Sequence, residues 1–253
     1  MDLLVANSEQ LAKAEALYCR YKETNAEKGI GRLQEKSVHG ILKFFLDADP
    51  THHEVKLPSG HVADIFDGQW ITEIQTGSYS ALAGKLAKLL LDYRVRVVCP
   101  IVRDRYLYYT NTEDGSVEKP RKSPLHGERC TSLVALSSLD AFLTHPNFQL
   151  CFLLLDVAET RVRSEGGYRK RDKRLDTIPL LVADAWSVQS REDYLSLLPT
   201  RLPDVFTAAQ FGKATHLRGR KRSFALKLLL SSDTVRQIGK EGRAYLYTIH
   251  PRR

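Results

Sequence analysis

The stretch Glu54–Thr76, EVKLPSGHVADIFDGQWITEIQT, decides how the first half of this chain folds. Asp67 and Gly68 lie near its centre, and this dipeptide is preferred in the two-residue turns of β-hairpins. Apolar and β-branched residues on both sides of the turn, and in one run before it, predict extended strands. The three predicted strands cover residues 54–57, 61–66 and 70–76.

Helical patterns flank these strands. The spacing of apolar residues predicts helices over residues 7–23 and 30–47 before the strands and over 80–93 after them. The next run, residues 94–101, predicts a buried strand. The resulting order of helix, three strands, helix and strand predicts an α/β fold with a mixed sheet.

Three acidic residues are candidates for a metal site. With a two-residue turn, Asp64 lies diagonal to Glu73, and alternate residues of a strand share a face, so Asp64, Glu73 and Gln75 point the same way. Glu35 lies at the end of the apolar stripe of the preceding helix, where a carboxylate needs a partner. Neighbouring carboxylates repel unless a cation neutralises them, and hard oxygen ligands favour Mg²⁺ or Mn²⁺ over zinc. The alternative is a hairpin with one solvated face, on which acidic residues are ordinary.

The run of Glu35, His61-Val-Ala-Asp64-Ile and Ile71-Thr-Glu73-Ile-Gln75 resembles the core of the PD-(D/E)XK nuclease superfamily. That superfamily has an αβββαβ order, a helical Glu, an Asp on the second strand and an acidic residue two positions before a Lys on the third. The resemblance covers about residues 30–101. One departure is Gln75, which stands where Lys is usual, and the Glu-Ile-Gln ending is similar to the variant of CoiA-type competence proteins.

The resemblance implies a restriction-endonuclease-like fold that hydrolyses phosphodiester bonds. In that scheme Glu35, Asp64 and Glu73 hold one or two Mg²⁺ or Mn²⁺ ions, which activate water and neutralise charge on the phosphate. Gln75 can orient a water molecule but brings no charge. Lys85 or Lys88, in the following helix, would supply the missing cation; the ordinary alternative for a helical Lys is a solvated surface position.

Formal charge is concentrated at the end of the chain. The whole chain carries a net charge of +8, and from Leu202 onward there are 11 Lys and Arg against 3 Asp and Glu. The first 201 residues therefore contain equal numbers of each sign. A neutral body joined to a basic module indicates a polyanionic partner for the module.

The basic module has the pattern of a winged helix. Thr207 is a predicted N-cap, a second helix is predicted over 217–230, and two strands are predicted over 235–238 and 243–247 around a Gly-Lys-Glu-Gly tip. The stretch resembles a winged helix-turn-helix domain over about residues 203–249. The concentrated charge favours duplex DNA as the partner of this module, with these predicted contact residues: Arg218, Arg220, Lys221, Arg222, Lys227, Lys240 and Arg243. Two alternatives are a basic helix that only packs on the body and a winged helix that docks protein.

Between the core and the module, strands are predicted over 106–109, 116–118 and 148–157, and a helix over 132–143. The basic stretch Arg161–Arg174 is predicted to be a loop, either solvated or in contact with phosphate. Pro199 and Pro203 indicate a linker, which gives a nuclease-like domain over 1–200 and a winged-helix domain over 201–253. Four dispersed cysteines suit a reducing cytoplasm, and no membrane span or secretory signal is expected.

These observations together predict a metal-dependent DNA endonuclease held on duplex DNA by a winged helix. The arrangement is similar to endonuclease subunits of some bacterial transposition systems, which suggests a mobile-element context. The alternative function is a DNA-binding regulator or adaptor with an inactive nuclease fold. Whether the chain acts as a homodimer or with a partner protein is left open.

Overall fold

The computed structural model describes residues 8–27, 37–77, 79–110, 116, 118–163 and 172–250. These residues form two compact units, each assembled from three stretches of chain. Unit 1 takes its residues from Met1–Gly68, Val102–His126 and Leu153–Ala185. Unit 2 takes its residues from Gln69–Ile101, Gly127–Phe152 and Trp186–Arg253.

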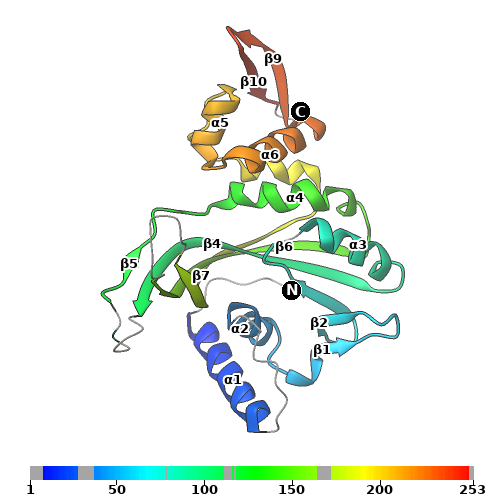
Figure 1. Cartoon of the computed structure of the whole chain (residues 1–253). Helices are drawn as coiled ribbons and strands as arrows, with labels where there is room; N and C mark the ends of the chain where they lie inside the picture. The colour runs from blue at the N-terminus through cyan, green and yellow to red at the C-terminus, as the bar shows by residue number, and fades with distance from the viewer. Residues whose placement is uncertain are drawn as a thin grey trace. The chain divides into compact units, whose positions relative to one another are not determined.

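A mixed sheet of seven strands runs through the fold, which is therefore of the α/β class (Figure 1). The strand order is β1-β2-β3-β4-β6-β7, and β5 pairs with β4. Strands β1 and β2 are antiparallel, whereas β3 and β4 are parallel. The bounds are His53–Lys56 for β1, Val62–Phe66 for β2, Trp70–Ile74 for β3, Arg94–Thr110 for β4, Arg121–Lys122 for β5, Phe148–Val162 for β6 and Lys173–Val188 for β7.

In unit 1, helix α1 (Ser8–Glu27) packs on helix α2 (Ser37–Leu46). Leu11, Ala14 and Tyr18 recur at helical spacing on α1 and are buried. Gly40 of α2 lies directly under the Tyr18 ring, so close that a Cβ atom at position 40 would overlap it. The close approach of the two helices therefore depends on a glycine at this position. The 3₁₀ turn η1 (Pro50–His52) then leads into β1.

In unit 2, the parallel pair β3 and β4 is joined by helix α3 (Tyr79–Leu89). Leu82, Leu86 and Leu89 form the buried stripe of α3. Parallel neighbours need such a crossover, and the helix buries its apolar stripe when it packs back on the sheet. Helix α4 (Leu133–Leu139) follows, between the 3₁₀ turns η2 (Arg129–Ser132) and η3 (Asp140–Phe142).

Asp140 begins η3 and holds the 3₁₀ turn η4 (Arg191–Leu197) in place. Its carboxylate accepts a hydrogen bond from the Tyr194 hydroxyl at 2.6 Å and two from the Arg191 guanidinium. Burial raises the pKa of Asp140, but the hydrogen bonds from Arg191 and Tyr194 outweigh it and hold this pKa below its ordinary value.

The end of unit 2 has a separate sheet and two helices: β8 (Val205–Thr207), α5 (Ala208–Thr215), α6 (Gly219–Ser231), β9 (Val235–Glu241) and β10 (Ala244–Ile249). The three strands are antiparallel in the order β8-β10-β9. Phe206 stacks on Phe211 and on Tyr247, at ring centroid distances of 5.9 and 6.0 Å. Helix α6 also packs on α4, so this region shares a core with the rest of unit 2.

The order of helix, three strands, helix and strand is confirmed, but several extents differ from the sequence predictions. Strand β4 runs on to Thr110 and so includes the predicted strand 106–109. Ser116 and Glu118 lie outside any strand, and Val117 lies outside the described residues. The predicted loop Arg161–Arg174 is shorter because β6 continues to Val162 and β7 begins at Lys173. Residues 164–171 of that loop lie outside the described residues.

Strand β7 has no counterpart among the predicted elements. Pro179 interrupts its pattern, and Pro cannot donate to a ladder, but it is tolerated on the last strand of a sheet, which is where β7 lies. Among the described residues, no helix is both long enough and apolar enough to cross a bilayer.

Candidate functional site

Asp64 lies at the centre of β2 in unit 1. Ala63 and Ile65, its neighbours along the strand, are buried, and Asp64 points to the opposite, half-buried face. There its Oδ2 lies 3.2 Å from Nε2 of His39, which α2 supplies. His39 comes four positions after Glu35 in the sequence. In the helix predicted over residues 30–47 this spacing would place both on one face, a signal that could have identified His39.

A second polar pair joins α2 to β1 in unit 1. Lys43, four residues after His39, is 3% exposed, and its Nζ lies 3.1 Å from Oε1 of Glu54. Glu54 has a φ of 52°, in the left-handed region that non-glycine residues rarely adopt. The buried ammonium of Lys43 needs a carboxylate partner. The contact that Glu54 supplies offers a physical reason for its unusual backbone conformation.

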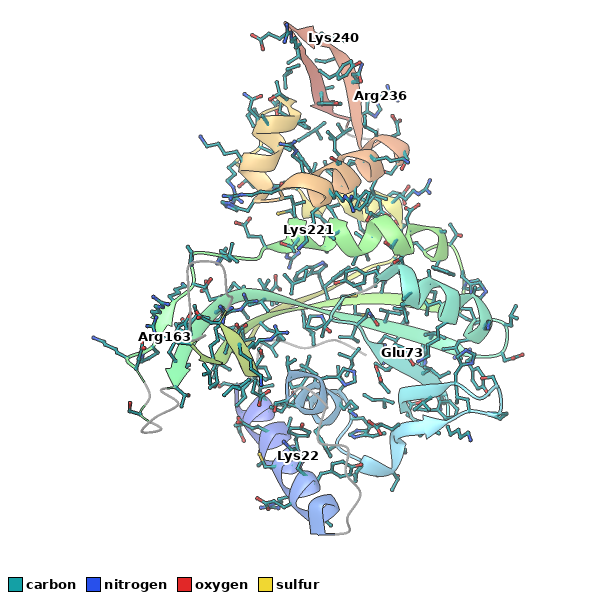
Figure 2. The ribbon with its side chains drawn as sticks, in the orientation of Figure 1. Lys22, Glu73, Arg163, Lys221, Arg236 and Lys240 are labelled. Atoms are coloured by element: carbon teal, nitrogen blue, oxygen red, sulfur yellow. The ribbon has the colours of Figure 1, made fainter. Side chains whose placement is uncertain are left out.

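Glu73 lies on β3 in unit 2 and is 4% exposed. Its Oε2 atom lies 2.6 Å from Nζ of Lys85 (Figure 2 labels Glu73). Lys85 comes three residues after Leu82 on α3, so its stem follows the buried stripe of the helix. Lys88, the other candidate cation, is exposed. Of the two lysines, Lys85 is therefore the one that contacts a predicted catalytic acid.

Gln75 comes one residue after the end of β3, and its backbone N–H donates to the carbonyl of Val98 at 2.9 Å. The residue therefore continues the parallel pairing of β3 with β4. Glu35 lies outside the described residues. Asp64 belongs to unit 1 and Glu73 to unit 2, so the convergence of the three acids stays a prediction.

The chemistry of these donors fits a hard divalent cation, because Asp64 and Glu73 offer carboxylate oxygens. Within the described ranges, which omit Glu35, no group of three His, Cys, Asp or Glu side chains is placed to hold a metal ion. Both carboxylates instead contact nitrogen donors, His39 and Lys85.

The basic end of unit 2 presents most of its predicted DNA-contacting residues to solvent. The N-cap predicted at Thr207 is confirmed, and it forms a capping box, since the side chains of Thr207 and Gln210 each accept a hydrogen bond from the other's backbone N–H and so fix the start of α5. Gly242, with a φ of 56°, forms the turn of the β9–β10 hairpin. The predicted contact residues that are exposed are Arg218, Arg220, Lys221, Lys227, Lys240 and Arg243.

Arg222 differs from the other predicted contact residues because it is half-buried. A Cβ atom at Gly212 would lie 2.7 Å from its Cδ, so the stem of Arg222 covers Gly212 and joins α6 to α5. Phe224, which the sequence analysis did not identify, is 52% exposed on α6 between Lys221 and Lys227. In the hairpin, Nζ of Lys240 lies 4.6 Å from the centre of the Tyr245 ring (Figure 2).

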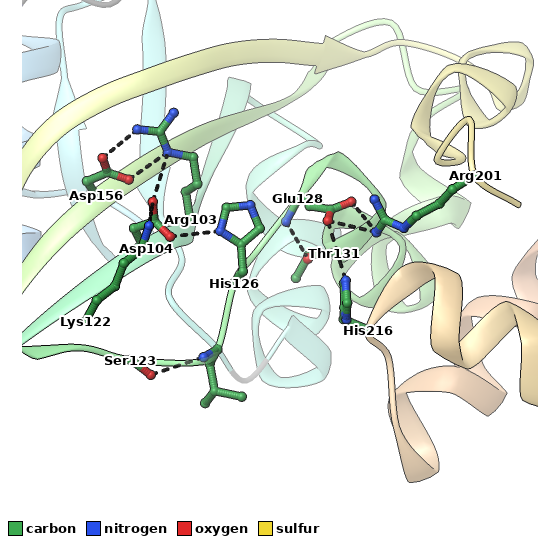
Figure 3. A network of polar contacts seen from close by, with 11 residues as sticks. Arg103, Asp104, Lys122, Ser123, His126, Glu128, Thr131, Asp156, Arg201 and His216 are labelled. Carbon is green, nitrogen blue, oxygen red and sulfur yellow. Dashed lines mark hydrogen bonds and ion pairs between the residues drawn. The ribbon is translucent and has the colours of Figure 1, made fainter.

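Unit 1 contains a network of arginines and buried carboxylates, of which the sequence indicated only the basic stretch Arg161–Arg174. Arg103 donates two hydrogen bonds to Asp156, and Asp104 pairs with Lys122 and His126 at 2.8 Å each (Figure 3). The hydrogen bond from Lys122 is the main reason why the pKa of Asp104 lies below its ordinary value. Arg103 and Asp156 are 53 positions apart, and Asp104 and His126 are 22 apart, so sequence spacing gave no signal for these pairs.

The comparison with protein families gives one match, to a model described as "Domain of unknown function (DUF8091)", over residues 36–189. The match covers more than half of the chain. The chain belongs to this family. No curated protein and no solved structure matches the chain.

The DUF8091 region contains Asp64, Glu73, Gln75 and Lys85, together with the arginine network of unit 1. Glu35 lies one position before its first residue, and the predicted DNA-contacting residues 218–243 lie after its last. The end of the matched region at residue 189 thus lies between the candidate metal ligands and the basic end of the chain.

Proposed function

We propose that this protein is a metal-dependent deoxyribonuclease of the PD-(D/E)XK type. The observation that carries the proposal is the 2.6 Å contact between Lys85 Nζ and Glu73 Oε2. The superfamily motif places its Lys two residues after the acid, where this chain has Gln75. Lys85 brings an ammonium to the same carboxylate from the following helix. The order α2-β1-β2-β3-α3-β4, with β3 and β4 parallel, supports the same assignment.

The residues have distinct roles in this proposal. Glu35, Asp64 and Glu73 would hold Mg²⁺ or Mn²⁺, which lowers the pKa of a bound water and neutralises charge on the phosphate. Lys85 offers positive charge beside Glu73. His39 orients Asp64 through Nε2. Gln75 can orient water through its amide but supplies no charge.

We propose that the end of unit 2 is a winged helix that holds duplex DNA. The succession β8-α5-α6-β9-β10 and the sheet order β8-β10-β9 support this assignment. In that arrangement α6 is the recognition helix and the β9–β10 hairpin is the wing. The exposed cations on both elements complement the phosphate backbone.

Cleavage of supercoiled plasmid by the full-length protein in Mg²⁺ or Mn²⁺ tests the nuclease proposal. We expect nicked or linear product from the wild type and a loss of at least about 100-fold in Asp64→Asn and Lys85→Met, consistent with loss of charge stabilisation. Asp67→Asn, in the same hairpin, and Lys88→Met, on the same helix, are matched controls that should keep activity. Activity that persists in Asp64→Asn would exclude the proposed site.

A DNA-binding regulator or adaptor with an inactive nuclease fold is the second candidate. Gln75 favours it, because a neutral amide replaces the usual motif cation. This candidate predicts salt-dependent duplex binding without cleavage in either metal. Binding that is retained while every preparation fails to cleave would select it over the nuclease.

A further inference from the structure

We infer that unit 1 carries a second binding surface for the phosphate backbone of duplex DNA, formed by arginines of β4, β5, β6 and β7. The surface is distinct from α6 and from the candidate metal ligands. The inference rests on the proposed function only for the choice of DNA as the polyanion.

Glu159 of β6 is the anchor of this surface. It is 1% exposed, and its two oxygens each meet a different arginine: Oε2 lies 3.0 Å from Nε of Arg105, and Oε1 lies 2.5 Å from Nε of Arg161. Arg174 approaches the same carboxylate at 4.0 Å. A buried carboxylate is tolerated only with such compensation. Among the described residues, Arg161 donates a hydrogen bond to Glu159 through Nε, whereas Arg105 is held there by the ion pair alone, and both side chains are partly exposed.

Tyr109 of β4 supports two further arginines. The ring is buried, and the guanidinium carbons of Arg121 and Arg163 lie 4.7 and 4.8 Å from its centre. Arg163 also donates two hydrogen bonds of 2.7 Å to Glu118. Stacking and hydrogen bonding therefore hold these two guanidinium groups against a rigid strand.

The surface keeps an excess of positive charge after all of these pairings. Among the described residues, its cations are Arg103, Arg105, Arg121, Lys122, Arg161, Arg163 and Arg174, and its carboxylates are Asp104, Glu118, Asp156, Glu159 and Asp172. These described residues number seven cations and five anions. If the cations served only to neutralise the carboxylates of this surface, they would not outnumber them. The excess of positive charge therefore favours binding of an anion from outside the protein.

A phosphodiester backbone fits this surface better than a small anion would. Guanidinium groups recognise phosphate oxygens through paired N–H donors, and anchored arginines lose little conformational entropy on binding. Six of the seven cations come from four strands and Arg163 directly follows β6, so they offer several contact points, which matches a polymer with regularly spaced charges.

The test is the salt dependence of binding of full-length protein to a short fluorescein-labelled duplex, measured by anisotropy in EDTA. The test variant is Arg121→Gln with Arg163→Gln, because both side chains are exposed and Glu118 is not left buried. The control is Arg191→Gln with Arg201→Gln, two similarly exposed arginines that pair with carboxylates in unit 2. Thermal melting of each variant verifies the fold.

We expect the test variant to bind about tenfold more weakly or worse, and the slope of log K against log salt to fall by about 1.8, corresponding to two phosphate contacts. The control should behave as the wild type. Equal slopes for wild type and test variant would overturn the inference.

Glu159→Gln separates positioning from bulk charge. This change makes the protein one charge more positive, so a non-specific charge effect would strengthen binding, whereas misplaced arginines would weaken it. We expect weaker binding, and stronger binding would count against the inferred surface.

Failure of the inferred DNA-binding surface can be distinguished from failure of the nuclease proposal. Binding is measured without metal, so a protein that binds but does not cleave leaves the surface in place and rejects only the enzyme. The α6 variant Arg220→Gln with Lys221→Gln reports separately on the basic module. If that variant abolishes binding while the Arg121 and Arg163 variant has no effect, DNA contacts the module alone and the inference fails.

Discussion

Replacing Lys85 by Met should destabilise the protein and remove cleavage together. At 2.6 Å, two unit charges in an effective dielectric of about 20 attract by about 6 kcal/mol before solvation costs. The Lys85 side chain is 24% exposed and that of Glu73 is 6% exposed, so desolvation and residual solvent screening offset part of this attraction. Loss of the ammonium leaves Glu73 buried with its charge uncompensated by Lys85. We expect the free energy of unfolding to fall by about 2–3 kcal/mol.

Urea denaturation followed by circular dichroism measures this loss, and Lys88→Met provides the baseline for removal of an exposed lysine from the same helix. Glu73→Gln with Lys85→Met should recover about half of the loss, because the buried charge is then gone as well. If Lys85→Met costs no more than Lys88→Met, the ion pair does not compensate Glu73. In that case the argument that Lys85 replaces the motif lysine fails too.

Three further predictions concern other parts of the molecule. Gly40→Ala should destabilise the packing of α1 on α2 by about 1–3 kcal/mol, because its methyl group would overlap Tyr18, whereas Gly84→Ala, with open space around it on α3, should stabilise by about 0.5–1 kcal/mol; urea midpoints check both, and equal effects would contradict the packing argument. The folded pKa of Asp140 lies below its unfolded value, so its contribution to stability is present above about pH 4 and is lost as the pH falls through the folded pKa; Asp140→Asn should therefore flatten the loss of stability in acid, seen as urea midpoints against pH, and an unchanged slope would exclude this linkage. Phe224→Ala should change the unfolding free energy by less than about 0.5 kcal/mol yet weaken duplex binding by about tenfold in anisotropy titrations, and unaltered affinity would remove Phe224 from the interface.

Local structure could be predicted from the sequence where it depends on residues close to one another in the chain. The N-cap at Thr207 depends on a side chain and a backbone N–H three residues apart, and both were visible. Lys85 and Lys88 were both candidates for the missing cation, and the structure shows that Lys85 is the one that contacts Glu73. Strand lengths were predicted less well: the strand expected over residues 94–101 continues as β4 to Thr110.

The arginine surface of unit 1 was hidden for a different reason. The basic stretch Arg161–Arg174 indicated one part of it, but charges sum to zero over the first 201 residues, so composition gave no indication of the contribution of β4 and β5. The excess appears only when β4, β5, β6 and β7 bring residues such as Arg105 and Arg161 to one carboxylate, Glu159. Strand pairing over more than 50 positions cannot be deduced from the spacing of charges.

The chain crosses between the two units several times, and β4, β6 and β7 each give residues to both. During synthesis, unit 1 cannot acquire its full set of strands until Ala185 has left the ribosome, and unit 2 must wait for the final helix and hairpin. The nascent polypeptide therefore exposes incomplete sheet edges for much of translation, when association with other chains is a hazard. We expect fragments that end between the two units to aggregate on expression, which makes point substitutions in the intact protein the appropriate genetic tool.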